Sequence, residues 1–200
     1  EEKRVARYLV GPYNNSWNFM DAYNKAQNGD IIEFEDGYAF QWPTNQEIVI
    51  DKELHFVGHA VPNSNGNGQI FKNSIEAAFR FVAGAKCFKI TGNYSTLLLW
   101  SGSEVTCKQV CFEISTQNNQ NFFLYADTHS KLILNNIEMK VPEKHDASIG
   151  IVASELSISH SRILSRIDLS DGARLTLETV DLEKYDINTI SAPNSEVTLK

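Results

Sequence analysis

Cys107 and Cys111 stand four residues apart in EVTCKQVCFE, and they are the first residues in this sequence whose type and spacing could do chemistry. Cysteine thiolates at such a spacing occur in zinc sites and in redox pairs. The same stretch alternates apolar and polar residues in the manner of a β-strand. The spacing alone leaves a metal site, a redox pair and one strand of a larger sheet open.

The nearest approach to an acid–base group is Asp168 and Asp171 with Arg166. A neighbouring base lowers the pKa of a carboxyl group and makes it a poor general acid. We therefore interpret this group as a charged corner. His129 and His160 fall at other corners without a third ligand type, and no phosphate-binding glycine loop, Ser/His/Asp order or HExxH motif is present.

The bulk composition, with 42% hydrophobic and 22% charged residues in 200, is that of one ordinary globular domain. A formal net charge of -7 disfavours a general electrostatic hold on nucleic acid or on an anionic membrane. No run approaches the roughly 20 apolar residues of a membrane helix, and the first residues lack a signal-peptide pattern. Three cysteines with no dense framework favour either a reducing compartment or buried thiols that never pair, so the cytoplasm is the expected location and export is the alternative.

The elements that position these residues begin with a helix. The stretch SWNFMDAYNKAQNGD predicts a helix over about residues 16–28, with Ser16 as its N-cap and Gly29 as its left-handed stop. DIIEFEDGYAF and EIVIDKELHFVGHA then alternate or carry β-branched residues and close at turn residues, which is typical of short strands.

From residue 97 onward the sequence repeats itself imperfectly. Each copy has a charged residue, then an apolar, a polar or β-branched and another apolar residue, two mostly polar residues, and an apolar close. A repeat of about 22 residues with three short strands and no helix fits one coil of a parallel β-helix. The copies are EVTCKQVCF (104 to 112), KLILNNIEM (131 to 139), ELSISHSRI (155 to 163), RLTLETVDL (174 to 182) and EVTLK (196 to 200).

The charged first position tests this register, because residues at one position in adjacent coils lie about 4.8 Å apart and like charges would repel. A second outward column contains Cys111, Glu138, Arg162 and Asp181. We predict a structural charge ladder whose main effect is to penalise a slipped register. Its charges alternate in sign through Glu104, Lys131, Glu155, Arg174 and Glu196.

The inward positions agree with this register. Cys107 falls in the column of Leu134, Ile158, Leu177 and Leu199, so it belongs to the core, whereas Cys111 faces outward. The two sulfurs then lie on opposite sides of one strand, and we expect no metal and no cofactor. A small residue suited to a tight corner recurs one position before the charge, at Ser103, Ser130, Ser154, Ala173 and Ser195.

With its opening segments NGDIIEFEDGYAF and IVIDKELHFVGHA, the chain resembles the right-handed parallel β-helix superfamily that includes pectin and pectate lyases. The resemblance covers about residues 13 to 200. It implies an all-β fold: one β-helix domain over residues 1–200, with an N-terminal capping helix and coils of roughly 20–27 residues from about residue 30.

Enzymes of this superfamily carry carboxylate clusters for calcium or for general acid work, with an Arg or Lys placed to take a proton from a uronate. The sequence shows no such cluster, and its acids stand in ladders opposite bases. The superfamily also contains adhesins and non-catalytic modules, so the fold does not decide the activity. We lean towards a protein that is not an enzyme.

One aromatic strip is the most interesting surface. Strand alternation turns Trp100, Phe123 and Tyr125 outward, with Arg166 and Asp168 two coils beyond Tyr125. Flat rings edged by hydrogen-bonding groups suit a sugar ring, and they equally suit a protein hot spot. A loop folding over these rings is the alternative.

The expected function is a non-catalytic scaffold or recognition module that binds a protein partner, or the remainder of its own polypeptide, through a side face. A glycan-binding or polysaccharide-degrading β-helix is the first alternative. The chain stops midway through a coil, from which we expect a fragment of a longer protein. Self-association through that open C-terminal end is the second alternative.

Overall fold

The protein is described here by a computed structural model. It describes residues 4–36, 38, 40–41, 47–58, 68–72, 78–81, 88–92, 95–98, 104–116, 122–140, 148–182 and 190–200. Within these residues the chain forms one α-helix and strands that belong to two parallel sheets. The prediction of a strand-dominated chain with a single helix is therefore confirmed.

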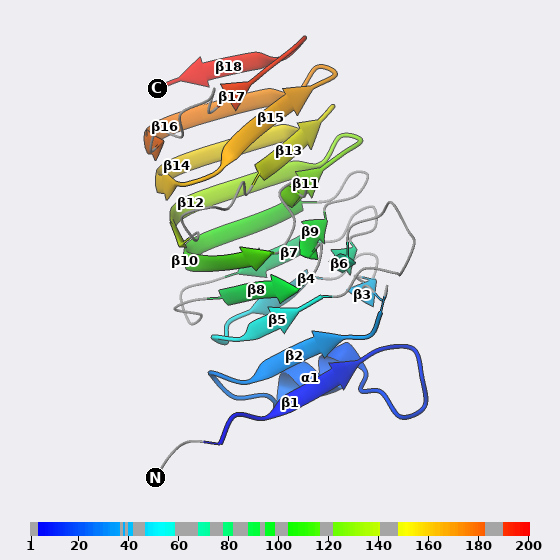
Figure 1. Ribbon diagram of the computed structural model, residues 1–200. Coiled ribbons are helices and arrows are strands. Elements are labelled where there is room, and N and C mark those ends of the chain that lie inside the picture. Colours follow the sequence, from blue (N-terminus) through cyan, green and yellow to red (C-terminus); the bar gives the residue numbers. More distant parts are fainter. Residues whose placement is uncertain are drawn as a thin grey trace.

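The larger sheet has 11 strands, and its main path runs β1-β2-β5-β8-β10-β12-β14-β16-β18, with β4 and β7 beside it (Figure 1). Its strands are β1 (Arg7–Val10), β2 (Ile31–Phe34), β4 (Glu47–Ile50), β5 (His55–Val57), β7 (Ala78–Phe81), β8 (Phe88–Gly92), β10 (Glu104–Thr116), β12 (Lys131–Lys140), β14 (Glu155–Ile163), β16 (Arg174–Leu182) and β18 (Glu196–Leu199).

The smaller sheet has seven strands in the order β17-β15-β13-β11-β9-β6-β3. These are β3 (Phe40–Gln41), β6 (Gly68–Lys72), β9 (Ser95–Leu98), β11 (Phe122–Ala126), β13 (Ser148–Val152), β15 (Arg166–Ser170) and β17 (Ile190–Ser191). From β10 onward consecutive strands alternate between the two sheets, so each strand pairs with the next but one along the chain.

The register of the larger sheet is the one that the aligned copies predicted. Glu104 lies opposite Lys131, which in turn lies opposite Glu155. Further along the sheet Glu155 is paired with Arg174, and Arg174 with Glu196. The column of Cys111, Glu138, Arg162 and Asp181 is also observed.

The ladder charges lie on the surface. Nη1 of Arg174 is 3.7 Å from Oε1 of Glu155, and both side chains are more than half exposed. An exposed ion pair of this kind stabilises a fold by about 0 to 1 kcal/mol. The main effect of these charges is therefore to disfavour other registers, and their contribution to the stability of the fold is small.

Each long strand of the larger sheet bends at one residue with left-handed backbone. In β10 the residues before this bend pair with β7, and those after it pair with β8. A left-handed residue costs strain when it is not glycine, and it redirects the chain within a single position. These bends are at Gln109 (φ 55), Asn136 (φ 53), His160 (φ 49) and Thr179 (φ 52).

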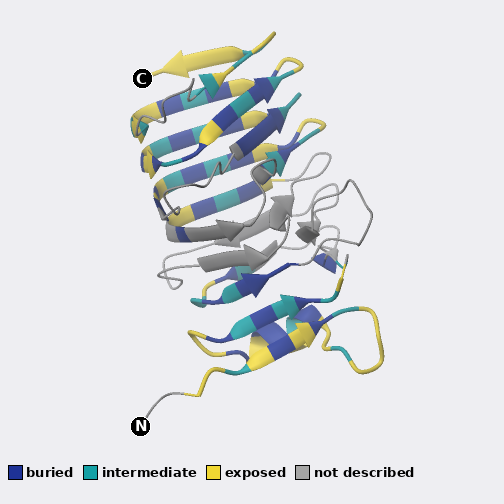
Figure 2. Ribbon diagram, in the orientation of Figure 1, coloured by how far each residue is buried: buried dark blue, intermediate teal, exposed yellow. Residues whose placement is uncertain are grey.

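The core lies between the two sheets, and Figure 2 shows buried and exposed residues alternating along its strands. Leu132, Leu156 and Leu175 are each at most 1% exposed, and Cys107 is fully buried. Burying a leucine side chain stabilises a fold by roughly 1.5 to 3 kcal/mol. The stacked inward columns are thus the main source of stability.

The N-terminal end of the larger sheet is covered by α1 (Phe19–Lys25), which lies against β1 (Figure 1). Asn18 is its N-cap, and its Oδ1 accepts hydrogen bonds from the N–H groups of Met20 (2.9 Å) and Asp21 (3.4 Å). The predicted span of 16–28 is therefore too long at both ends.

The two predicted helix boundaries are wrong for different reasons. Ser16 is not the N-cap, because its hydroxyl donates to Oε1 of Glu35 at 2.9 Å. The C-cap is Ala26, with extended backbone, so the helix has already ended before Gly29. Gly29 does adopt a left-handed conformation (φ 93), but in the next turn, where its N–H donates to the carbonyl of Glu53 at 2.7 Å.

An aromatic cluster joins this helix to the sheet. The ring of Phe19 lies 4.5 Å from that of Phe40 and 6.0 Å from that of Phe34, measured between centroids. The Tyr23 hydroxyl donates to Asp51, and burial followed by this bond raises the pKa of Tyr23. Nζ of Lys52 lies 4.5 Å above the same ring. The helix is thus held by both apolar and polar contacts.

Candidate functional site

Tyr125 is the described aromatic residue of the predicted strip. Its neighbours in β11, Leu124 and Ala126, are buried (1% and 0% exposed), as strand alternation predicted, and the Tyr125 side chain is half-buried on the opposite face. Trp100 lies outside the described residues. So does the side chain of Phe123, although its backbone is part of β11.

In the register of the smaller sheet, one residue from each of four neighbouring strands lies in a single row with Tyr125. Tyr125 lies opposite Leu98 of β9 on one side and Gly150 of β13 on the other, and Gly150 lies opposite Asp168 of β15. Asp168 is therefore two strands beyond Tyr125, which is the separation the sequence predicted. The residue between them is a glycine, which contributes no side chain to the outer face.

Arg166 occupies the neighbouring row of the same face. Its Nε and Nη2 atoms donate to Oδ2 of Asp168 at 3.1 and 2.9 Å. The Arg166 side chain is more exposed (55%) than that of Asp168 (25%). Two hydrogen bonds fix the planar guanidinium group against the carboxylate while leaving its other edge towards solvent.

Acidic groups surround the Tyr125 ring. Its hydroxyl donates to Oδ2 of Asp127 at 3.5 Å. Burial, the charge of Asp127, this hydrogen bond and the charge of Asp171 together raise the pKa of Tyr125, with burial the largest cause. Tyr125 is therefore a neutral hydrogen-bonding ring beside negative charge.

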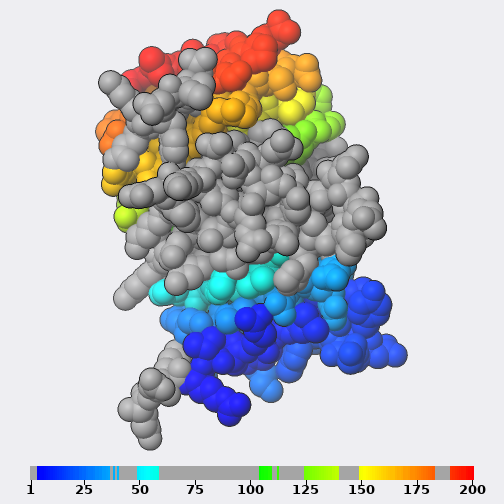
Figure 3. Space-filling view, viewed as in Figure 1, coloured from blue at the N-terminus to red at the C-terminus, as the bar shows by residue number. Residues whose placement is uncertain are grey.

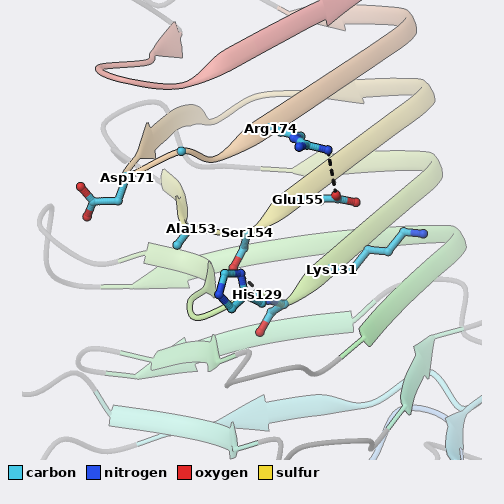
Figure 4. Close-up of a pocket in the computed structure, with 9 residues that line it drawn as sticks. His129, Lys131, Ala153, Ser154, Glu155, Asp171 and Arg174 are labelled. Carbon is cyan, nitrogen blue, oxygen red and sulfur yellow. Dashed lines mark hydrogen bonds and ion pairs between the residues drawn. The ribbon is translucent and has the colours of Figure 1, made fainter.

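A groove of about 440 Å³ follows the corner into which β11, β13 and β15 lead (Figure 4). A left-handed residue stands directly before the small residue of this corner in each repeat: His129 (φ 59), Ala153 (φ 47), Gly172 (φ 80) and Asn194 (φ 52). In two repeats the preceding residue, Thr128 (φ 50) or Asp171 (φ 53), is left-handed as well. The corner begins only a few residues after Tyr125. The lining residues are His129, Ser130, Lys131, Ala153, Ser154, Glu155, Asp171, Gly172 and Arg174.

Serine hydroxyls hold this corner together. The Oγ atom of Ser154 accepts a hydrogen bond from the backbone N–H of Ser130 at 3.0 Å. The Ser130 hydroxyl in turn donates to the carbonyl of Asp127 at 2.7 Å. These bonds agree with the predicted role of the small-residue column. In the next repeat the column holds Ala173, which has no hydroxyl to offer to the N–H of Ser154.

A second groove, of about 680 Å³, follows the bends of the larger sheet. It is lined by the left-handed residue of each bend and by the two residues that follow it in the same strand. These residues are Asn136, Ile137, Glu138, His160, Ser161, Arg162, Thr179, Val180 and Asp181. Here the Oγ atom of Ser161 accepts from the N–H of Ile137 at 2.9 Å and donates to the carbonyl of Ser159 at 2.8 Å. The same device, a serine hydroxyl from the next strand, therefore stabilises both kinds of bend.

The cysteines offer no chemistry that the described residues support. Cys107 is a free thiol in the core, and burial raises its pKa far above the ordinary range. The side chain of Cys111 lies outside the described residues. Among the residues whose side chains are described, no group of three His, Cys, Asp or Glu could hold a metal ion.

Several features of this site escaped sequence reasoning. The column of small residues predicted a corner, but the sequence did not predict that the residue before each of them is left-handed. Alanine, which stands at position 153, rarely adopts that conformation. Gly172 and Asn194, at the same position in later repeats, are the signal that was present. The two grooves were not predicted either.

Compared with protein-family models, with curated proteins and with solved structures, the chain matches none of them. Among the described residues, no helix has the length and the hydropathy needed to cross a membrane.

Proposed function

We propose that this chain is a right-handed parallel β-helix module that recognises a protein partner through one side face and carries out no catalysis. We define the recognition face as Tyr125, Asp127, Arg166, Asp168 and Asp171. Trp100 and Phe123 remain members of this face on sequence grounds alone.

The alternation of strands supports the β-helix. Each repeat from β10 onward contributes the two halves of a bent strand to one sheet and a third short strand to the other. Three segments stacked in parallel on their counterparts one repeat later are what a β-helical coil requires. Connections that leave a strand and return parallel to it in the same sheet are right-handed in about 98% of cases.

One observation carries the recognition proposal: Tyr125 and the Arg166–Asp168 pair lie on one face, separated by a glycine. Tyrosine and arginine are the side chains that dominate protein hot spots, because each buries a large area with few rotatable bonds or with fixed geometry. The three acids around them favour a partner segment with lysine or arginine side chains.

The described carboxylates argue against catalysis by a carboxylate pair. Asp168 is bound by Arg166, and Glu155 lies beside Arg174. A carboxylate whose oxygens are engaged by a guanidinium group is poorly placed to act on a substrate as one member of a carboxylate pair. We therefore expect these carboxylates to bind and to orient a partner.

Mutation of the recognition face tests the proposal. The partner is first identified by affinity capture from the source organism, and its Kd is then measured with purified components. We expect Tyr125→Ala to raise Kd at least about tenfold, as truncation of a hot-spot residue does. Thr176→Ala, on the outer face of the other sheet, is the matched control and should leave Kd unchanged. Equal affinities of the Tyr125→Ala and control variants would disprove the proposed face.

A glycan is the second candidate, favoured by the same tyrosine ring with carboxylate and guanidinium groups from a neighbouring strand. Binding on a glycan array that Tyr125→Ala abolishes would support it. Formation of an ultraviolet-absorbing product from polyuronates would point to a lyase and would contradict the non-catalytic proposal.

A further inference from the structure

The corner groove lies over a turn that is one residue shorter than the turns on either side of it. The turn lengths are compared between residues that are aligned in the two sheets. These are Ala126, Ile151 and Leu169 in the smaller sheet, and Lys131, Glu155 and Arg174 in the larger one. Four residues cross the corner in the outer two repeats (127–130 and 170–173), but three cross it in the middle one (152–154). The groove is the space over the shorter turn, and the longer turns form its walls.

The shorter turn also interrupts the hydrogen bonds of the corner. The N–H of His129 donates to the carbonyl of Ala153, and that of Gly172 donates to the carbonyl of Asn194, each at 2.9 Å. The equivalent bond from Ala153 to Gly172 is missing, because the N–H of Ala153 donates to the carbonyl of Ser170 at 3.1 Å instead. Within the described part of the chain, the carbonyl of Gly172 therefore accepts no hydrogen bond.

The backbone N–H of Ser154 is a donor without a partner at the same step between repeats. The N–H of Ser130 binds Oγ of Ser154, but the position that would serve Ser154 in this way is held by Ala173. No acceptor among the described residues pairs with this N–H. Ser154 is only 4% exposed, and a buried donor left unpaired costs about 1 to 3 kcal/mol. The groove thus holds one unpaired donor and one unpaired acceptor.

The two ends of the groove carry opposite charges. Asp171 lines it towards the smaller sheet and Lys131 towards the larger one, and Figure 4 shows these side chains at opposite ends. Neither forms an ion pair with another residue of the described part of the chain, whereas Glu155 and Arg174 lie 3.7 Å apart. The groove therefore offers a negative charge beside the recognition face and a positive charge at the far end.

We propose that the corner groove binds an extended peptide segment of the protein partner. In an extended chain the N–H and C=O of one residue point to the same side. Such a residue can accept from the N–H of Ser154 and donate to the carbonyl of Gly172, which supplies both bonds that the shorter turn lacks. A basic side chain of the segment lies at Asp171 and an acidic one at Lys131. A neutral glycan would leave both of these charges without a partner.

This inference rests on the proposed function, because Asp171 belongs to both the recognition face and the groove. It adds the form of the partner segment, which is extended, and its order of charges, which is basic at one end and acidic at the other. Peptide recognition of this kind draws its affinity from main-chain hydrogen bonds and its specificity from side chains.

Short peptides test the groove by itself. The probes are capped alanine pentapeptides that carry one arginine and one glutamate, at every spacing and in both orders. They are titrated into the 15N-labelled 200-residue chain and followed by NMR. We expect the amide proton of Ser154 to move downfield as it gains an acceptor, and one order of charges to bind at least about fivefold more tightly than the other. No movement of this proton with any peptide, or equal binding of both orders, would overturn the proposal.

Two groove variants sharpen this test. Ala173→Ser places a hydroxyl where it can accept from the N–H of Ser154, so it should raise the peptide Kd at least about tenfold and abolish the movement of that proton. Lys131→Gln should raise the Kd about two- to fivefold, as expected for an exposed ion pair. Lys108→Gln, an exposed lysine of the same sheet outside the groove, is the matched control and should leave the Kd unchanged. Equal Kd values for the two lysine variants would contradict the acidic end of the segment.

The captured partner separates this inference from the proposed function. We expect Tyr125→Ala, Ala173→Ser and Lys131→Gln each to weaken its binding. If Tyr125→Ala alone weakens it, the recognition face stands and the groove inference is wrong. If none of the three weakens it, both proposals are wrong.

Discussion

The first and last strands of the larger sheet, β1 and β18, are both edge strands, and they differ in what covers them. β1 is covered by α1 on the core side and by Trp17 along its outer edge. β18 has β16 on one side, and its inward residues Val197 and Leu199 are exposed. In Figure 3 these two strands lie at opposite ends of the molecule.

This difference shows that alternation of apolar residues decides which way a side chain points, but not whether it is buried. Leu177 and Leu199 occupy the same inward column one strand apart, and their exposures are 6% and 74%. Burial in stacked strands comes from the next strand or from a capping element.

The largest expected effect is the loss of the cover at the β1 end. Phe19→Ala should lower the free energy of unfolding by about 3 to 5 kcal/mol, because the fully buried ring contacts Phe34, Phe40 and Tyr23. Urea denaturation followed by circular dichroism measures it. Met20→Ala, a partly exposed position on the same helix, is the control and should cost far less. Equal losses would mean that the helix does not cover the core end.

Leu177 and Leu199 provide a test with the same residue type in the same column. Leu177→Ala should cost about 2 to 5 kcal/mol of unfolding free energy, whereas Leu199→Ala should cost well under about 1 kcal/mol, because Leu177 is 6% exposed and Leu199 is 74% exposed. Urea denaturation of the 200-residue chain measures both costs. A large cost for Leu199→Ala would show that this side chain is buried in the 200-residue chain.

The serine column comes next in expected size. Ser154→Ala removes the acceptor from the N–H of Ser130 in a buried corner, so it should cost about 1 to 3 kcal/mol of unfolding free energy. Ser157→Ala, on a half-buried outward position of the same strand, serves as the control. A cost no larger than that of the control would show that water replaces the serine hydroxyl.

The register and the inward columns could be predicted because their signal is local and repeated. Charges of alternating sign at Glu104, Lys131 and Glu155 exclude a slip of one residue, which would also turn Leu132 and Leu156 to the outside. The facing of Leu124 and Tyr125 followed from the same alternation. Those predictions needed no contact that is distant along the chain.

Features decided by distant contacts could not be predicted. Ser16 and Asn18 both have side chains that cap helices, and the choice falls to Asn18 because Ser16 is bound by Glu35, 19 residues further along. The corner groove depends on Ala153 adopting a left-handed conformation, for which its own sequence gives no signal. Trp17 covers β1 through a backbone bridge to Val10 and through an edge-on contact of its ring with that of Tyr8, 5.3 Å between centroids. Neither contact is indicated by the local pattern of apolar and polar residues.

The observed N-cap gives a smaller effect at the covered end. Asn18→Ala should lower the free energy of unfolding by about 0.5 to 2 kcal/mol, since the N–H groups of Met20 and Asp21 lose their acceptor. Asn18→Ser, which keeps an acceptor, should restore most of it. Ser16→Ala is the contrasting variant, because Ser16 was the cap predicted from sequence. A larger loss for Ser16→Ala would return the helix start to that residue.

The smallest expected effect is a gain in stability towards the β18 end. Ala173→Ser should place a hydroxyl beside the N–H of Ser154, as Ser154 does for Ser130, and raise the free energy of unfolding by about 0.5 to 1.5 kcal/mol. The added oxygen must fit a position that is 0% exposed, as Ser154 fits at 4%. A gain would mean that the hydroxyl-to-backbone bond transfers from one corner to the next. A loss would mean that the corner at Ala173 is packed too tightly to accept an oxygen atom.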